Sequence, residues 1–109
     1  MDRYTRWREA LQQAPDVEAV NAIMRDYVDE LGPVTGVFPG HCQAVIRGEL
    51  DIQAAAVVLL QCELAFSGSK EARALLHEVA YTFASAAVRI TLLHGRPSRA
   101  RASDPVRSA

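Results

Sequence analysis

The chain has 109 residues, half of them hydrophobic, which is enough for one globular domain with its own core. Its 12 basic residues nearly balance its 13 acidic residues, so the net charge of −1 argues against a chain-wide affinity for nucleic acid or an anionic membrane. The two cysteines, Cys42 and Cys62, are too few for the disulfide framework of a small secreted domain.

The sequence predicts a cytoplasmic protein without a membrane-spanning segment. Residues 4–8 already carry charge where a signal peptide would need an apolar core. The longest apolar run covers seven residues, from Ala54 to Leu60, whereas a helix needs about 20 to cross a bilayer. In this compartment both cysteines are expected to remain reduced.

Two amphipathic helices open the chain. In the first, which begins at Asp2, apolar residues recur at helical spacing and form one face: Tyr4, Trp7, Leu11 and Ala14. Pro15 interrupts this helix, and a second one runs from Asp16 to Leu31, where Gly32 and Pro33 end it. Because the joint is so short, we expect the two helices to form an antiparallel hairpin.

The middle of the chain contains a loop, a short helix and the most apolar helix. Residues 34–40 are typical of a connecting loop, from which Val37 and Phe38 are expected to reach the core. A short helix follows at residues 41–47. Asp51 then caps a helix from Ile52 to Phe66, in which polar residues are rare.

A long final helix, from Ser69 to His94, carries an unbroken heptad stripe. Ser69 is placed to cap its first turn, and Gly95 marks its expected end. Apolar residues alternate at spacings of four and three, the repeat of a helix that lays one seam against its neighbours: Ala72, Leu76, Val79, Phe83, Ala86, Ile90 and Leu93.

The predicted fold is therefore all-α, an antiparallel bundle of four main helices plus one short helix, formed by a single domain over residues 1–95. Residues 96–109 are expected to form a flexible, disordered tail that is rich in arginine: Arg96, Arg99, Arg101 and Arg107. We do not expect this tail to bind nucleic acid. No aromatic residue is interleaved with the arginines, and the preceding 95 residues hold 8 basic and 12 acidic groups.

The helix from Ile52 to Phe66 is apolar around nearly its whole circumference, and a chain of this length supplies only about three helices to cover it. We therefore expect self-association, as a two-fold homodimer that shares the last two helices. The alternative is that the final helix bends near Thr82 and Ser85 and folds over its own core, because hydroxyl groups there can bond to preceding carbonyls.

Residue spacing reveals no catalytic or metal-binding constellation. His77 begins a sequence that resembles the zinc-binding helix of metalloproteases, but Tyr81 stands where that motif requires a second histidine. To bind zinc, His41, Cys42, Cys62 and His77 would have to converge from three segments, and they lack the close-spaced ligand pairs of structural zinc sites. We therefore expect two small buried cysteines, no metal, no cofactor and no enzymatic activity.

We expect a small regulator or adaptor that acts by protein–protein contact, with itself and with a second protein that the sequence does not identify. The predicted interaction face lies on the outward side of the final helix and contains Arg73, His77, Tyr81, Ser85 and Arg89. The alternative is a small-molecule sensor with an apolar pocket between the helices, lined by Trp7, Tyr27, Phe38, Phe66 and Phe83.

Overall fold

The computed structural model describes residues 3–102, and every regular element in that range is helical, which confirms the all-α prediction. The body is built from four long helices: α1 (Arg3–Gln13), α2 (Val17–Leu31), α4 (Ile52–Ala65) and α5 (Lys70–Ala102). Between α2 and α4 the chain forms a 3₁₀ segment (Gly32–Val37), the short helix α3 (Gly40–Ala44) and a π-type turn (Val45–Glu49).

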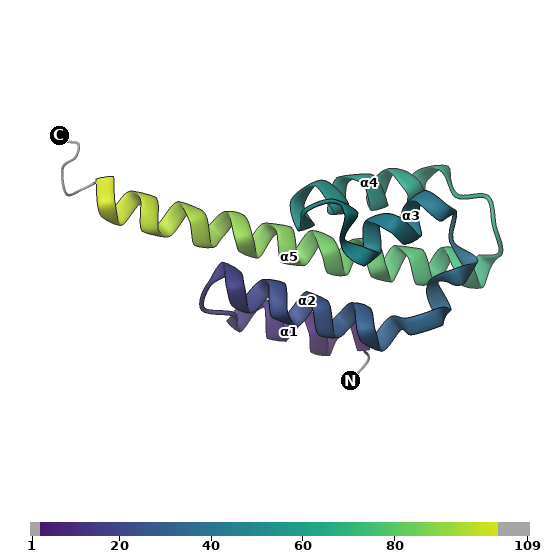
Figure 1. The fold of residues 1–109 in the computed structure, drawn as a ribbon, viewed down its shortest axis with the longest axis horizontal. Coiled ribbons are helices and arrows are strands. Elements are labelled where there is room, and N and C mark those ends of the chain that lie inside the picture. The colour runs from purple at the N-terminus through teal and green to yellow at the C-terminus, as the bar shows by residue number, and fades with distance from the viewer. Residues whose placement is uncertain (1–2, 103–109) are drawn as a thin grey trace.

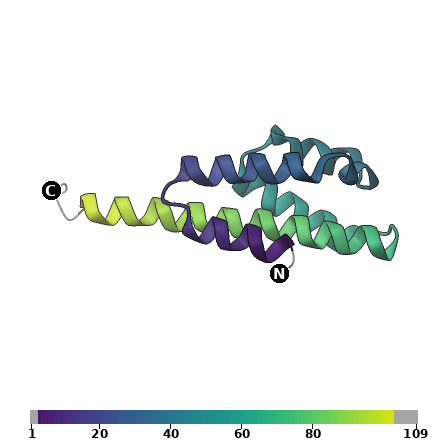
Figure 2. The same cartoon turned by 90° about the horizontal axis from the view of Figure 1, so that it is seen from below.

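The other long helices, α1, α2 and α4, pack on α5, the longest element, and α3 packs on α4. Figure 1 shows α3 and α4 on one side of α5, and α1 with α2 on the other. In Figure 2, α1 lies alongside α5. The helices of each sequential pair, α1 with α2 and α4 with α5, run antiparallel, whereas the α3 segment carries the chain back so that α4 runs in the same direction as α2 (Figure 1). The predicted antiparallel bundle is therefore confirmed. Within residues 3–102, none of the helices combines the length and the apolar character needed to cross a membrane.

Side-chain caps fix the starts of three helices at the predicted places. The carboxylate of Asp16 accepts from the amide of Ala19 at 2.8 Å, and that of Asp51 accepts from Ala54, also at 2.8 Å. The hydroxyl of Ser69 accepts from the amide of Ala72 at 3.1 Å. Each cap satisfies a backbone donor that has no partner within the helix, and such caps typically stabilise a helix by about 1 kcal/mol.

The heptad stripe of α5 forms the centre of the core, as predicted. All seven of its residues are buried, and Leu76, Val79 and Ala86 have no exposed surface. Phe38 also reaches the core, whereas Val37, predicted to do the same, is 58% exposed. Val37 ends the 3₁₀ segment, in which successive side chains project in different directions, so only one of two neighbours can point inward.

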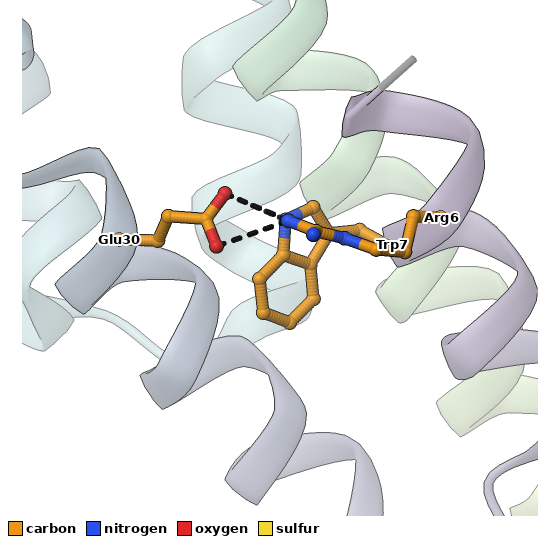
Figure 3. Close-up of polar contacts among 3 residues, drawn as sticks. All are labelled: Arg6, Trp7 and Glu30. Carbon is orange, nitrogen blue, oxygen red and sulfur yellow. Dashed lines mark hydrogen bonds and ion pairs between the residues drawn. The ribbon is translucent and has the colours of Figure 1, made fainter. Parts of the chain in front are cut away.

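A polar contact ties α1 to α2 at the open end of their hairpin (Figure 3). Nη2 of Arg6 donates to both carboxylate oxygens of Glu30, at 3.0 and 2.9 Å, and Nε1 of Trp7 donates to the same carboxylate at 3.4 Å. Beneath this contact the Trp7 ring meets the buried Tyr27 ring edge-on, with centroids 5.4 Å apart. Edge-on aromatic pairs of this kind add to the packing of one helix on another.

The last helix is longer than predicted. α5 continues to Ala102, eight residues beyond its expected end at His94. The helix runs through Gly95 and Pro97, although glycine costs about 1 kcal/mol and proline about 3 kcal/mol relative to alanine in a helix interior. Neither residue therefore terminates it. Residues 96–102 of the predicted tail are therefore helical, and residues 103–109 lie outside the described part of the chain.

The final helix does not fold back over its own core. The hydroxyl of Thr82 donates to the Glu78 carbonyl at 2.9 Å, the back-bond considered as a cause of bending. The ribbon of α5 nevertheless runs unbroken past this position (Figure 1). This chain therefore does not adopt the alternative in which a bent final helix covers its own core.

Candidate functional site

One side of α4 is left uncovered by the rest of the chain. Ala55, Ala56 and Leu59 are buried, but Val57 is about half exposed and Leu64 is 82% exposed. The expectation that this helix has more apolar circumference than its neighbours can cover is therefore confirmed. An uncovered apolar side of this kind is a candidate contact surface.

A second row of exposed apolar residues lies on α5. Tyr81 and Leu92 are about half exposed and Val88 is 59% exposed. Their spacings of seven and four place them on one side of the helix. The row borders a cavity of about 310 Å³ between α5 and α1, to which Gln12 and Ala84 also contribute.

Two contacts between α4 and α5 show that these exposed residues share one surface. Near one end, the side-chain amide of Gln53 donates to the Thr91 hydroxyl at 2.9 Å. Near the other end, the His77 imidazole pairs with the Glu63 carboxylate. We call the exposed apolar surface that these contacts span the outer face. It consists of Val57, Leu64, Tyr81, Val88 and Leu92.

The outer face carries little free charge. Glu63 is the only charged residue of α4, and its carboxylate is paired with His77. On the opposite flank, Arg89 directs its guanidinium to the Ala14 carbonyl. Apolar side chains combined with a scarcity of charge are typical of the centre of a protein–protein interface.

The first three residues of the predicted interaction face lie at the α4 side of α5. Nη1 of Arg73 donates to the Phe66 carbonyl at 2.8 Å, and the His77 ring pairs with Glu63. The ring of Tyr81 stacks on His77, with centroids 4.3 Å apart. Of these three residues, Tyr81 alone belongs to the outer face.

The other two residues of the predicted face lie at the α1 side of α5. The Ser85 hydroxyl is 3.4 Å from that of Tyr4. Arg89 donates to the Ala14 carbonyl through Nε at 3.1 Å and Nη2 at 2.7 Å. A spacing of four exceeds the helical repeat of 3.6 residues, so each step drifts by about 40° around the helix. Over four steps the row passes from one neighbouring helix to the other, and no single partner could contact all of it.

Sequence reasoning missed four of the five residues of the outer face: Val57, Leu64, Val88 and Leu92. A signal for two of them was present, because Val88 and Leu92 are large apolar residues of α5 that fall outside its heptad seam. No comparable signal marks Val57 or Leu64, since nearly every position of α4 is apolar.

The five aromatic residues of the predicted pocket are not gathered around one cavity. Tyr27, Phe38 and Phe83 are buried core residues, and Trp7 packs against Tyr27. Phe83 also borders a cleft between α2 and the π-type turn, whereas Phe66 borders a different cavity at the end of α4. Large aromatic side chains at helical spacing here serve mainly to fill the core.

The cleft between α2 and the π-type turn has a volume of about 380 Å³. Buried Met24, Ile46 and Phe83 contribute to its lining. The exposed residues Arg25 and Arg47 lie among its lining residues as well. An apolar lining with a few charged groups is typical of small-molecule sites, and the volume is at the lower end of their range.

Three of the four residues considered as zinc ligands come together where α3 meets α4. Nε2 of His41 lies 3.1 Å from Sγ of Cys62 and 3.8 Å from Sγ of Cys42. Sequence spacing gives no sign of this proximity, because it is the contact between α3 and α4 that brings His41 and Cys42 to Cys62. His77 lies elsewhere, with Glu63.

Burial controls the ionisation of one of these thiols. Both cysteines are free, and Cys42 has no exposed surface. Its pKa is raised from 9.0 to about 12, first because burial disfavours the charged thiolate, and then through the hydrogen bond and the charge of Cys62. Cys42 is therefore a neutral thiol at physiological pH in the absence of a metal.

Comparison with protein-family models, with curated proteins and with solved structures gave no match to this chain. Functional inference therefore depends on the geometry of the described residues.

Proposed function

We propose that this protein is a small helical regulator or adaptor that acts by protein–protein contact, as a homodimer joined through the outer face. The observation that carries the proposal is the group of apolar side chains left exposed on one side of α4 and α5: Val57, Leu64, Tyr81, Val88 and Leu92. Monomeric proteins rarely leave such residues together on one surface unless the surface binds something.

A second copy of the chain is the partner that fits this surface. The outer face has little free charge, so two identical copies can approach without repulsion between like charges. A two-fold axis would place the α4–α5 hairpin of one subunit against that of the other, and two-fold dimers are the commonest oligomers.

The size of the face sets the expected strength of the dimer. Burying the exposed parts of the four aliphatic residues on both copies would contribute about 10 kcal/mol. Association costs about 4–15 kcal/mol in lost motional freedom. When the cost is at the lower end of that range, about 6 kcal/mol of net stabilisation remains, so we expect a weak dimer with a dissociation constant of about 10–100 μM.

The proposal includes a cytoplasmic location, which the two free thiols support because disulfides form readily in oxidising compartments. In the dimer, the surfaces of α1, α2 and α3 that lie away from the outer face would remain available to a further protein. Regulation would then follow from presenting helical surfaces in a fixed, paired arrangement.

Sedimentation equilibrium across the micromolar range tests the proposal. We expect the mass to rise from 11.9 kDa to twice that value as the concentration increases. Leu64→Glu and Leu92→Glu would each place a charge in the interface and weaken the dimer at least about 30-fold, which corresponds to about 2 kcal/mol. Both side chains are exposed in the subunit, so the fold should tolerate these changes.

The matched control is Val37→Glu. Val37 is 58% exposed but lies in the 3₁₀ segment, outside the outer face, so this variant should dimerise as the unmodified protein does. A mass of 11.9 kDa at the highest concentration, or equal weakening by all three variants, would contradict the proposal.

A second candidate function is a small-molecule sensor, favoured by the cleft between α2 and the π-type turn. An apolar ligand bound there would contact Met24, Ile46 and Phe83 and lie near the guanidinium of Arg47. A thermal-shift screen of apolar acids tests it, because a ligand that binds the folded state raises the melting temperature by mass action. The shift should disappear in Arg47→Glu if the ligand occupies this cleft, and because Arg47 is exposed the fold should tolerate the change.

A further inference from the structure

The cluster where α3 meets α4 offers three ligand atoms of the kind that thiophilic metal ions prefer. Nε2 of His41, Sγ of Cys42 and Sγ of Cys62 all lie within 4.8 Å of one another. The cluster is separate from the outer face. Cys62 lies on α4 two positions before Leu64, about 160° away around the helix, and it faces α3.

The distances match those of a tetrahedral zinc site. With Zn–S bonds of about 2.3 Å and Zn–N bonds of about 2.0 Å, a sulfur and a nitrogen ligand are separated by about 3.6 Å. The two sulfur–nitrogen distances here are 3.1 and 3.8 Å, on either side of that value. The two sulfur atoms lie within 4.8 Å of each other, compared with about 3.8 Å in a tetrahedral site. Binding therefore requires shifts of at most about 1 Å among the three side chains.

The surroundings leave room for a fourth ligand. A cavity of about 220 Å³ is lined by His41 and Cys62 together with Pro39, Phe66 and neighbouring residues of the turn that follows α4. A water molecule or a small exogenous ligand can therefore reach the side of the cluster that the three protein ligands leave open. Three protein ligands with one open position are the arrangement of reactive zinc sites, whereas structural sites have four protein ligands.

Charge and ligand type favour zinc. Two thiolates and a neutral imidazole around Zn²⁺ give a group with no net charge, which lowers the penalty for burial beside Cys42. Mg²⁺ and Ca²⁺ prefer oxygen ligands, which this cluster lacks. Binding is balanced by the loss of one proton from each thiol, so each zinc ion releases two protons.

We propose that His41, Cys42 and Cys62 bind one Zn²⁺ ion in a three-ligand site whose fourth position opens to the adjacent cavity. The site would join α3 to α4 and hold the irregular segment between α2 and α4 against the bundle. It is independent of dimerisation through the outer face.

Cobalt titration of the full, reduced chain tests the proposal. Co²⁺ occupies zinc sites and reports its ligands by absorption. We expect one Co²⁺ per chain, the intense visible bands of tetrahedral cobalt, and a thiolate-to-cobalt charge-transfer band whose intensity corresponds to two thiolates. Added Zn²⁺ should abolish these bands, and an indicator in weak buffer should record the release of two protons per ion.

Variants assign the ligands. Cys62→Ser and His41→Gln should each weaken binding at least about 100-fold, whereas His94→Gln, a change to an exposed histidine of α5 outside the cluster, should leave it unchanged. The spectrum of the unmodified protein counts the thiolates by itself, so the test holds even if one variant fails to fold.

Three results would overturn the proposal. One is the absence of charge-transfer absorption at saturating Co²⁺. Another is equal affinity in the three variants. The third is stoichiometric binding of Cu⁺ without binding of Zn²⁺, which would exclude zinc as the metal of this site.

Discussion

Replacing Arg89 by methionine tests whether its guanidinium holds α5 against the end of α1. Nε and Nη2 of Arg89 both donate to the carbonyl oxygen of Ala14, 75 residues earlier in the chain, at 3.1 and 2.7 Å. Ala14 is only 3% exposed, so water has little access to that carbonyl once the guanidinium is removed. Methionine retains most of the aliphatic stem, and the change therefore isolates the polar contact.

The structure sets the expected size of the effect. Hydrogen bonds from a charged donor contribute about 1.5–3 kcal/mol, and a buried carbonyl left without a partner loses a similar amount. We expect Arg89→Met to lower the free energy of unfolding by about 2 kcal/mol, which for a domain of this size lowers the melting temperature by about 8–16 °C. Thermal unfolding, followed by circular dichroism, measures this decrease in melting temperature. Both proteins are compared at the same concentration, because dimerisation would shift the midpoint.

Arg73→Met is the matched control. Arg73 also donates to a backbone carbonyl, that of Phe66 at 2.8 Å, but it is exposed and the contact spans only seven residues. Its loss should cost less than about 1 kcal/mol, because water replaces the lost donor. Equal losses in the two variants, or a change below about 0.5 kcal/mol for Arg89→Met, would refute the assignment of Arg89 to the fold.

Four further outcomes follow from particular residues. Gly48 has φ of +107°, a conformation that alanine adopts only with strain, so Gly48→Ala should destabilise the fold by about 1–3 kcal/mol. Gly36 has no such conformation, and Gly36→Ala should be neutral or slightly stabilising. Urea unfolding of the two variants measures the difference. With its pKa near 12, the thiol of Cys42 should react with iodoacetamide at pH 8 at least about 10-fold more slowly than a thiol of pKa 9.0, as peptide mapping of the metal-free protein would show. Because the unfolded chain ionises this thiol above pH 9.0 and the folded chain does so only near 12, the free energy of unfolding should fall as pH rises through that interval. Finally, Glu30→Gln should cost no more than about 1 kcal/mol, because its pair with Arg6 is solvent-exposed; the effect should shrink in high salt.

The two proposals can be separated experimentally because they use different sides of α4. Cys62 faces α3 and Leu64 faces outward. Cys62→Ser should therefore abolish metal binding and leave the dissociation constant of the dimer unchanged, whereas Leu64→Glu should do the reverse. A parallel loss of both properties in one variant would indicate a disturbed fold, which circular dichroism would detect.

Local sequence patterns determined the helices and the side of α5 that is buried. The heptad repeat, the caps at Asp16, Asp51 and Ser69, and the break at Pro15 depend on residues within one or two helical turns of each other, so they can be read without a tertiary structure. The end of α5 could not be read in this way, because the helix continues through Gly95 and Pro97, two residues that usually mark a helix end.

Tertiary structure alone decided which residues make up the candidate sites. α4 is apolar on nearly every side, and only the positions of α3 and α5 determine that Leu64 stays outside while Leu59 is buried. His41 and Cys62 are 21 residues apart, and no spacing rule connects them until α3 packs on α4. The helical period is a property of the local backbone, whereas covered surfaces and ligand clusters depend on how separate helices are placed, and that placement is set by the packing of the whole chain.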